Sequence, residues 1–145
     1  MDYVEEFDKL KTKVLKYILF KKRTEKEVRQ KFREDSGELL DDVIEELKEL
    51  DYINDEFYIQ KAINEFRNLK NMSIKEIQYK LMAKGIKKDD IDNYICNNKE
   101  ELLDYEINSA KNIFTKKQTT MEEEEIEMYL RKKGFLSETI KLAQE

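Results

Sequence analysis

Apolar residues recur along the chain in pairs four positions apart, and the pattern is copied at an interval of 49 residues. Side chains at positions i and i+4 lie on the same face of an α-helix, so each pair predicts one amphipathic helix. A fixed period of this length is typical of proteins built from structural repeats. The three pairs are Val28 and Phe32, Ile77 and Leu81, and Ile126 and Leu130.

The starts of these helices follow the same interval. Thr24 with Glu27 and Ser73 with Glu76 each match a capping box, in which the hydroxyl accepts from the third helical amide and the glutamate reaches back. Both boxes stand in register with the apolar pairs. The third copy has Glu122 in place of the hydroxyl, so we expect the box to be lost there, although a carboxylate still suits a helix N-terminus.

A glycine comes after each of the three helices, at Gly37, Gly85 and Gly134. Glycine just past a helix end takes the left-handed conformation at little cost, so we expect each to terminate its helix. A further helix follows each glycine, and an earlier one precedes each capping position, the first from about Val4 to Phe20.

The predicted fold is therefore all-α, with three tandem three-helix repeats in an elongated, curved, solenoid-like array. We place the repeats at residues 1–56, 57–104 and 105–145 of one continuous array. The chain of 145 residues has no proline and three glycines, a composition that favours uninterrupted helices.

Composition also narrows the class of protein. Cys96 is the single cysteine, so no internal disulfide forms; we expect it to be buried and the compartment to be the cytoplasm. No apolar run approaches the length that spans a bilayer, and the acidic opening at Met1–Glu6 predicts no signal peptide. Histidine is absent, which removes the usual member of zinc and acid–base sites. We expect no enzyme activity, no catalytic residue, no cofactor and no metal.

Two carboxylate clusters are candidates for a metal or acid–base site. They lack the spacing of a loop whose oxygens converge on one ion. Each precedes the first apolar residue of a third helix, so the favoured interpretation is that they cap that helix and complement its dipole. The clusters are Asp41 with Asp42, and Asp89 with Asp90 and Asp92.

Charge is segregated along the chain although the formal net charge is only −5. Residues 11–33 carry a balance of +8 and residues 34–56 one of −10; residues 57–88 carry +6 and residues 89–106 carry −6. This alternation indicates a basic stripe that binds a partner or DNA, and the alternative interpretation, a solvated charged surface, stays open beside it. Lys116, Lys117 and Arg131–Lys133 extend it with less support. The candidate residues are Lys21, Lys22, Arg23, Lys31, Arg33, Lys61, Arg67, Lys70, Lys84, Lys87 and Lys88.

Five aromatic residues are candidates for a platform on which single-stranded nucleic acid stacks. Aromatic residues at helical spacing are more often core or half-core residues, and we favour that interpretation. They are Tyr52, Phe57, Tyr58, Tyr79 and Tyr94.

These residues together resemble the RecX family, the bacterial regulators of the RecA recombinase. The resemblance covers the chain from about Val14. It rests on Tyr17-Ile18-Leu19 with Arg23-Thr24-Glu25, on Leu50 to Phe57, and on Ile77, Leu81 and Lys84-Gly85-Ile86. Asp51 and Asn54 stand where the family usually has a glycine and an aspartate, and Tyr58 replaces a small residue.

The resemblance implies three-helix repeats that lie along the groove of a RecA–DNA filament and restrain its ATPase and strand exchange, in DNA repair and homologous recombination. It carries over no catalytic residue. The expected protein is a monomer that binds RecA and, through its basic helices, also single- or double-stranded DNA. The alternative is a stand-alone, non-specific DNA-binding protein. A helix-turn-helix reader is disfavoured, because Asp89 and Asp90 would begin its second helix and face phosphate.

Overall fold

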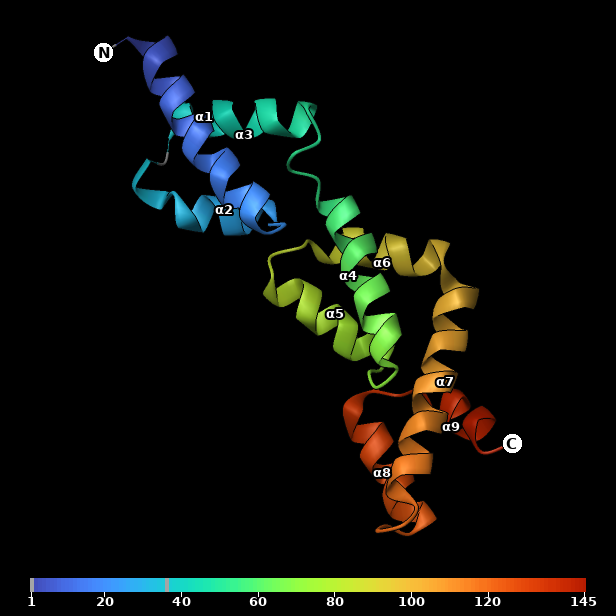
Figure 1. Ribbon diagram of the computed structural model, residues 1–145. Coiled ribbons are helices and arrows are strands. Elements are labelled where there is room, and N and C mark those ends of the chain that lie inside the picture. The colour runs from blue at the N-terminus through green and yellow to red at the C-terminus, as the bar shows by residue number, and fades with distance from the viewer. Residues whose placement is uncertain (1, 36) are drawn as a thin grey trace. The chain divides into compact units, whose positions relative to one another are not determined.

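The computed structural model describes residues 2–35 and 37–145, and within these ranges it contains nine α-helices and no strand (Figure 1). The predicted all-α class is confirmed, and the curved tandem array stays a prediction. A short 3₁₀ helix, Arg33–Asp35, lies between α2 and α3. The helices are α1 Tyr3–Phe20, α2 Glu25–Lys31, α3 Glu38–Glu49, α4 Asp55–Leu69, α5 Ile74–Ala83, α6 Lys88–Asn97, α7 Lys99–Lys117, α8 Glu123–Lys133 and α9 Ser137–Ala143.

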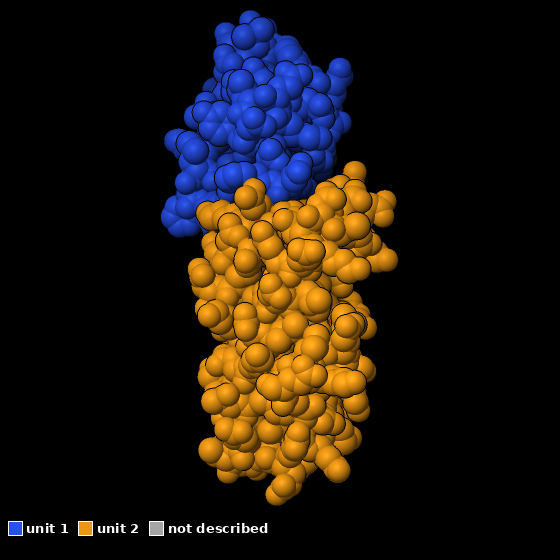
Figure 2. Space-filling view, turned by 90° about the vertical axis from the view of Figure 1, so that its right-hand side faces the viewer, with its two compact units in different colours: residues 1–58, 84–86 blue, residues 59–83, 87–145 orange. Residues whose placement is uncertain are grey.

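The chain divides into two compact units, coloured separately in Figure 2. Unit 1 comprises residues 1–58 and 84–86, so it contains α1 to α3, the first turn of α4 and a short segment from further along the chain. Unit 2 comprises residues 59–83 and 87–145.

The core of unit 1 forms where α1 packs against α3 and α2 closes the side. Leu10, Val14 and Ile18 of α1 are buried, as the amphipathic pattern predicts. They meet Val28 and Phe32 of the first repeated pair and four apolar residues of α3. Those four are Leu40, Val43, Ile44 and Leu47.

In unit 2, α7 packs against both α8 and α9, and α5 packs against α6 (Figure 1). The other two repeated pairs are buried here: Ile77 with Leu81, and Ile126 with Leu130. Because all three pairs are buried, the 49-residue period marks the helix positions that turn inward.

Capping boxes begin the second helix of each triplet. The Thr24 hydroxyl accepts from the Glu27 amide at 3.1 Å, and Ser73 Oγ accepts from the Glu76 amide at 3.1 Å. The prediction that the box is lost at the third copy was wrong. Glu122 is the N-cap of α8, and Glu125 accepts from its backbone N–H at 3.5 Å. A glutamate side chain is long enough to act as the cap in place of a hydroxyl.

The glycine prediction holds at two of its three positions. Gly85 and Gly134 have φ of 94° and 97°, the conformation expected after a helix. Gly37 also has a positive φ, but its φ of 121° and ψ of −158° are not the left-handed helical conformation. It is the N-cap of α3, because the 3₁₀ helix continues the chain after α2 ends.

The N-termini of α2 and α5 are covered in the same way, each by a segment from further along the chain. In unit 1, Thr24 Oγ1 donates to the Lys84 carbonyl at 2.6 Å, and Asp55 accepts from the Glu25 amide at 3.0 Å. In unit 2, Ser73 Oγ donates to the Lys133 carbonyl at 2.7 Å. We call these two N-termini, at Thr24 and at Ser73, the first and second sockets.

The second socket has a carboxylate too, since Glu106 accepts from the Ile74 amide at 3.1 Å. Each occupant includes one of the positive-φ glycines, which brings its backbone against a lysine side chain: Gly85 against Lys26 and Gly134 against Lys75. A side chain on either glycine would collide with that lysine. The glycines therefore serve the packing of the sockets as well as the ends of the helices.

Candidate partner-binding surface

The predicted basic residues fall into two sets, one in each unit. A continuous stripe through both units stays a prediction, and each set is described in its own unit. Unit 1 contains Lys21, Lys22, Arg23, Lys31, Arg33 and Lys84; unit 2 contains Lys61, Arg67, Lys70, Lys87 and Lys88.

In unit 1 the cations gather on aromatic rings. The Arg23 guanidinium lies 4.2 Å from the centre of the Tyr17 ring, and Lys31 Nζ lies 5.8 Å from the same centre. Lys22 Nζ lies 3.9 Å above the Phe57 ring. These cation–π contacts hold the positive charges at defined places without neutralising them.

Arg23 is held further by Glu27, whose carboxylate lies 4.0 Å from its guanidinium. Its Nε is buried and has no hydrogen-bond partner in the structure. Lys21 and Arg33 are exposed, and along the chain each lies two residues from Arg23 or Lys31. The structure therefore brings Arg23 and Lys31 together on the ring of Tyr17.

In unit 2 acidic neighbours offset part of the positive charge. Arg67 pairs with Glu101 at 3.5 Å, and Lys88 pairs with Asp92 one helical turn on at 3.8 Å. Lys61, Lys70 and Lys87 are exposed, and Lys87 is the N-cap of α6. Exposed ion pairs are weak, so Arg67 and Lys88 remain available to a stronger acidic partner.

The capping role predicted for the carboxylate clusters was wrong. Gly37 and Lys87 are the N-caps of α3 and α6, and neither helix has a side-chain cap. Asp41, Asp89 and Asp90 lie in the first turns instead, where they complement the helix dipole. Within residues 2–35 and 37–145, no group of three or more potential metal-ligating side chains is placed to hold an ion.

The acids of α3 take part in a charge network across unit 1. Arg29 donates to Asp41 at 2.6 Å and pairs with Glu25 at 3.2 Å, and Lys48 pairs with Glu25 at 3.0 Å. Partial burial opposes ionisation of Glu25, but the hydrogen bonds from Lys48 and Arg29 prevail and lower its pKa. The hydrogen bond to Asp41 raises the pKa of Arg29. This network joins α2 to α3.

Some side chains are more exposed than the sequence predicts. Cys96 is exposed, not buried. Tyr52, Phe57 and Tyr79 are also exposed, so the core interpretation is wrong for these three. Tyr58 and Tyr94 are half-buried, as expected. An amphipathic pattern identifies a helix face, but packing decides how much of that face is covered.

Glu106 is the buried group that sequence reasoning missed. It is 1% exposed, and Thr139 donates to its Oε2 at 2.6 Å. Burial raises the pKa of its carboxyl, although hydrogen bonds from Thr139 and from the amides of Ile74 and Leu136 oppose the rise. A carboxylate inside an otherwise apolar helix face is the signal that could have singled it out.

The helices and the filled sockets define an all-helical protein, and its unit 1 holds basic residues on aromatic rings. None of the helices within the described ranges is long and apolar enough to cross a membrane. Among curated proteins, the regulatory protein RecX of Finegoldia magna is 37% identical over 99 residues, which cover 67% of this chain and 46% of that protein. The regulatory protein RecX of Clostridium beijerinckii is 35% identical over 111 residues, which cover 75% of this chain and 48% of that protein. The chain belongs to the RecX family.

Solved structures agree on the fold. The crystal structure of RecX from Lactobacillus salivarius has a TM-score of 0.81 at 22% identity, covering 97% of this chain and 96% of that one. A second crystal structure of a regulatory protein RecX has a TM-score of 0.80 at 21% identity, covering 97% and 74%. No family model matches the chain. The chain spans about half the length of the curated relatives it matches.

Proposed function

We propose that the protein is a regulator that binds the RecA recombinase filament on DNA and restrains its ATPase and strand exchange. The observation that carries the proposal is the 35–37% identity to proteins named regulatory protein RecX. Three tandem repeats, at residues 1–56, 57–104 and 105–145, are the body that we propose lies along the filament. We further propose that it acts in the cytoplasm as a monomer, in DNA repair and recombination.

The basic residues support this proposal by their position and exposure. Arg23 and Lys31 share the Tyr17 ring, with exposed Lys21 and Arg33 nearby. Charges held in place by aromatic rings lose less conformational freedom when a partner binds. Acidic protein side chains and DNA phosphates both fit such a surface.

The test is the ATPase rate of RecA on single-stranded DNA as the protein is added. We expect the rate to fall as the protein approaches the concentration of RecA. An unchanged rate at stoichiometric excess contradicts the proposal. The assay should be repeated on RecA preassembled on DNA and on RecA added last, because a protein that lies along the filament acts in both orders.

The second candidate function is non-specific DNA binding without RecA. The observation that favours it is the end of α1, where Phe20 is 87% and Leu19 is 70% exposed beside Lys21 and Lys22. An exposed ring among lysines suits a single strand, whose bases stack on it while its phosphates meet the cations. A helix-turn-helix mode is again disfavoured, since Asp89 and Asp90 occupy the first turn of α6.

Fluorescence anisotropy with a labelled single strand separates the two functions. A stand-alone DNA-binding protein binds tightly at low salt and loses affinity steeply as salt rises. Absence of binding at low salt removes this candidate and leaves the RecA proposal untouched.

A further inference from the structure

The N-terminus of α8 is the third copy of a position whose first two copies are filled. Thr24, Ser73 and Glu122 are N-cap positions spaced 49 residues apart. In the first two sockets a glycine turn covers the helix start, and Thr24 and Ser73 are both fully buried. Glu122 is exposed. The third socket, at Glu122, is therefore open.

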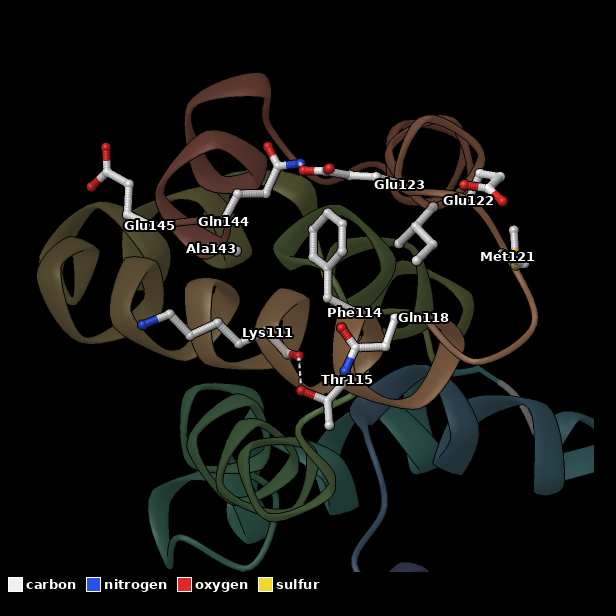
Figure 3. Close-up of a pocket in the computed structure, with 11 residues that line it drawn as sticks. Lys111, Phe114, Thr115, Gln118, Met121, Glu122, Glu123, Ala143, Gln144 and Glu145 are labelled. Atoms are coloured by element: carbon white, nitrogen blue, oxygen red, sulfur yellow. Dashed lines mark hydrogen bonds between the residues drawn. The ribbon is translucent and has the colours of Figure 1, made fainter.

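A hollow of about 580 Å³ lies beside this socket, between α7, α8 and the end of α9. Figure 3 shows the Phe114 ring in its middle, with Glu122 and Glu123 on one side and Ala143 and Gln144 on the other. Phe114, Ile126 and Ala143 give the hollow an apolar floor. Apolar residues at the floor of a mostly polar hollow suit an apolar side chain or two of a docking protein segment.

The rim of the hollow is acidic. Glu122, Glu123 and Glu145 line it, against the single cation of Lys111. The amide nitrogen of Gln144 donates to Glu123 at 2.7 Å and to Glu127 at 2.6 Å. One neutral amide thus holds two carboxylates close together without offsetting their charge. A lysine ammonium or arginine guanidinium group would bind these two carboxylates more strongly than the amide does, because it carries a positive charge.

The filled sockets indicate the kind of occupant. In unit 1 the occupant is the segment Lys84–Ile86, and in unit 2 it includes the end of α8, Arg131–Lys133, with Gly134. In both, a lysine at or directly after the end of a helix accepts the socket's hydrogen bond through its carbonyl and precedes a glycine. We propose that the third socket binds a basic helical segment of a partner protein, whose apolar face covers Phe114 and whose lysines or arginines meet Glu122 and Glu123.

A second copy of this chain is the less suitable occupant. Its available glycine turn is the one at Gly37, where an added Cβ would meet nothing within 4 Å. That turn follows Glu34 and Asp35, which have the same charge as Glu122 and Glu123. Glu122 also cannot donate to a turn carbonyl, as the hydroxyls of Thr24 and Ser73 do. Repulsion and the lost hydrogen bond both oppose continuation of the array by self-association.

The probe is a fluorescent peptide that repeats residues 78–88 of the chain, which contain four lysines and Gly85. Its matched control has the four lysines replaced by glutamate and keeps every apolar residue. Anisotropy of each peptide is measured with the full chain and with three variants, Glu123→Lys, Lys111→Glu and Glu65→Lys. Glu65 is exposed on α4, away from the residues that line the hollow.

The lysine peptide is expected to bind and the glutamate peptide not to bind. Glu123→Lys should weaken binding about threefold and Lys111→Glu should strengthen it about threefold, the usual size for an exposed charge pair. Glu65→Lys should change neither. Because the two rim variants act in opposite directions, loss of folding cannot imitate the result.

Three outcomes would overturn the proposal. They are no binding of the lysine peptide at millimolar concentration, equal binding of both peptides, and equal effects of Glu65→Lys and Glu123→Lys. Sedimentation of the protein alone tests the second-copy occupant: a dimer that Glu123→Lys disrupts would assign the hollow to self-association instead. RecA is absent from these assays, so their result is independent of the function proposed above.

Discussion

The buried carboxylate of Glu106 joins three parts of unit 2. Its two oxygens accept from Thr139 Oγ1 and from the Ile74 amide, at 2.6 and 3.1 Å. We expect Glu106→Gln to lower the free energy of unfolding by about 1–3 kcal/mol, because the amide nitrogen would face a donor and leave it without an acceptor. Urea unfolding followed by circular dichroism measures the change.

The exposed neighbour Glu100→Gln is the matched control, and its effect should stay below about 0.5 kcal/mol. If both variants unfold at the same urea concentration as the unmodified protein, the hydrogen bonds of Glu106 contribute nothing to stability.

The same residue makes stability depend on pH. Burial raises the pKa of Glu106 above its ordinary value of 4.5, so the folded state binds the proton more tightly than the unfolded state. The stabilisation that protonation adds is complete below 4.5 and is lost as pH rises through the folded pKa. The gap between the unmodified protein and Glu106→Gln should therefore widen as pH falls from 7 towards 4.5. A gap that narrows would show that the pKa is lowered instead.

At the scale of elements, alanine variants of the three glycines separate the stability that comes from packing in the sockets from the cost of backbone strain. Gly85→Ala and Gly134→Ala place a Cβ against Lys26 and Lys75, the second at 2.9 Å from Lys75 Cβ, on a backbone with positive φ. In Gly37→Ala the added Cβ has no neighbour within 4 Å, so only the strained backbone conformation opposes the substitution. At Gly85 and Gly134 we expect a loss of about 1–2 kcal/mol from the left-handed backbone and a further loss from the collision. At Gly37, whose φ of 121° and ψ of −158° are essentially restricted to glycine, we expect a loss of about 1–3 kcal/mol from strain alone.

Thermal unfolding of the three alanine variants ranks them by the stability that each has lost. Gly37→Ala shows the effect of backbone strain without a collision, since nothing lies within 4 Å of its added Cβ. Losses at Gly85 and Gly134 of no more than about 2 kcal/mol would mean that the socket packing relaxes around the added methyl group.

Helix positions and helix starts were predictable because the signals are local. A capping box needs residues only three apart, and an apolar pair only four, so Thr24 with Glu27 and Ile77 with Leu81 could be identified from the sequence. Gly37 was assigned wrongly because the 3₁₀ helix at Arg33–Asp35 separates it from the end of α2. Such a short continuation has little sequence signature of its own.

At the scale of the whole molecule, the charge of unit 1 is the feature that a partner would meet. The double variant Lys21→Glu with Arg33→Glu reverses two exposed cations beside the Arg23 and Lys31 pair. We expect it to weaken the proposed inhibition of the RecA ATPase by about tenfold, since reversed charges would oppose binding instead of assisting it.

The control is Lys9→Glu with Lys99→Glu, which changes the net charge equally at exposed positions outside the candidate set. Equal loss of inhibition in both double variants would show that only the total charge matters, and would remove the specific role assigned to Lys21 and Arg33.

Part of the candidate surface could be predicted from composition along the chain, and part could not. The runs around Lys21–Arg23 and Lys84–Lys88 were visible as excess positive charge. The acidic partner of Arg67 was not visible, because Glu101 lies 34 residues away along the chain. The aromatic rings under Arg23 and Lys22 likewise become neighbours only when α1, α2 and the start of α4 pack.

The sequence by itself determined the all-helical class, the 49-residue period, two of the helix starts and the family. These depend on spacings within one or two helical turns, or on similarity along the chain. Only the tertiary structure decided that Glu106 is buried, that Cys96 and Phe57 are exposed, and that the third socket is open. Those properties depend on which distant segments cover a side chain, and coverage is set by packing between elements.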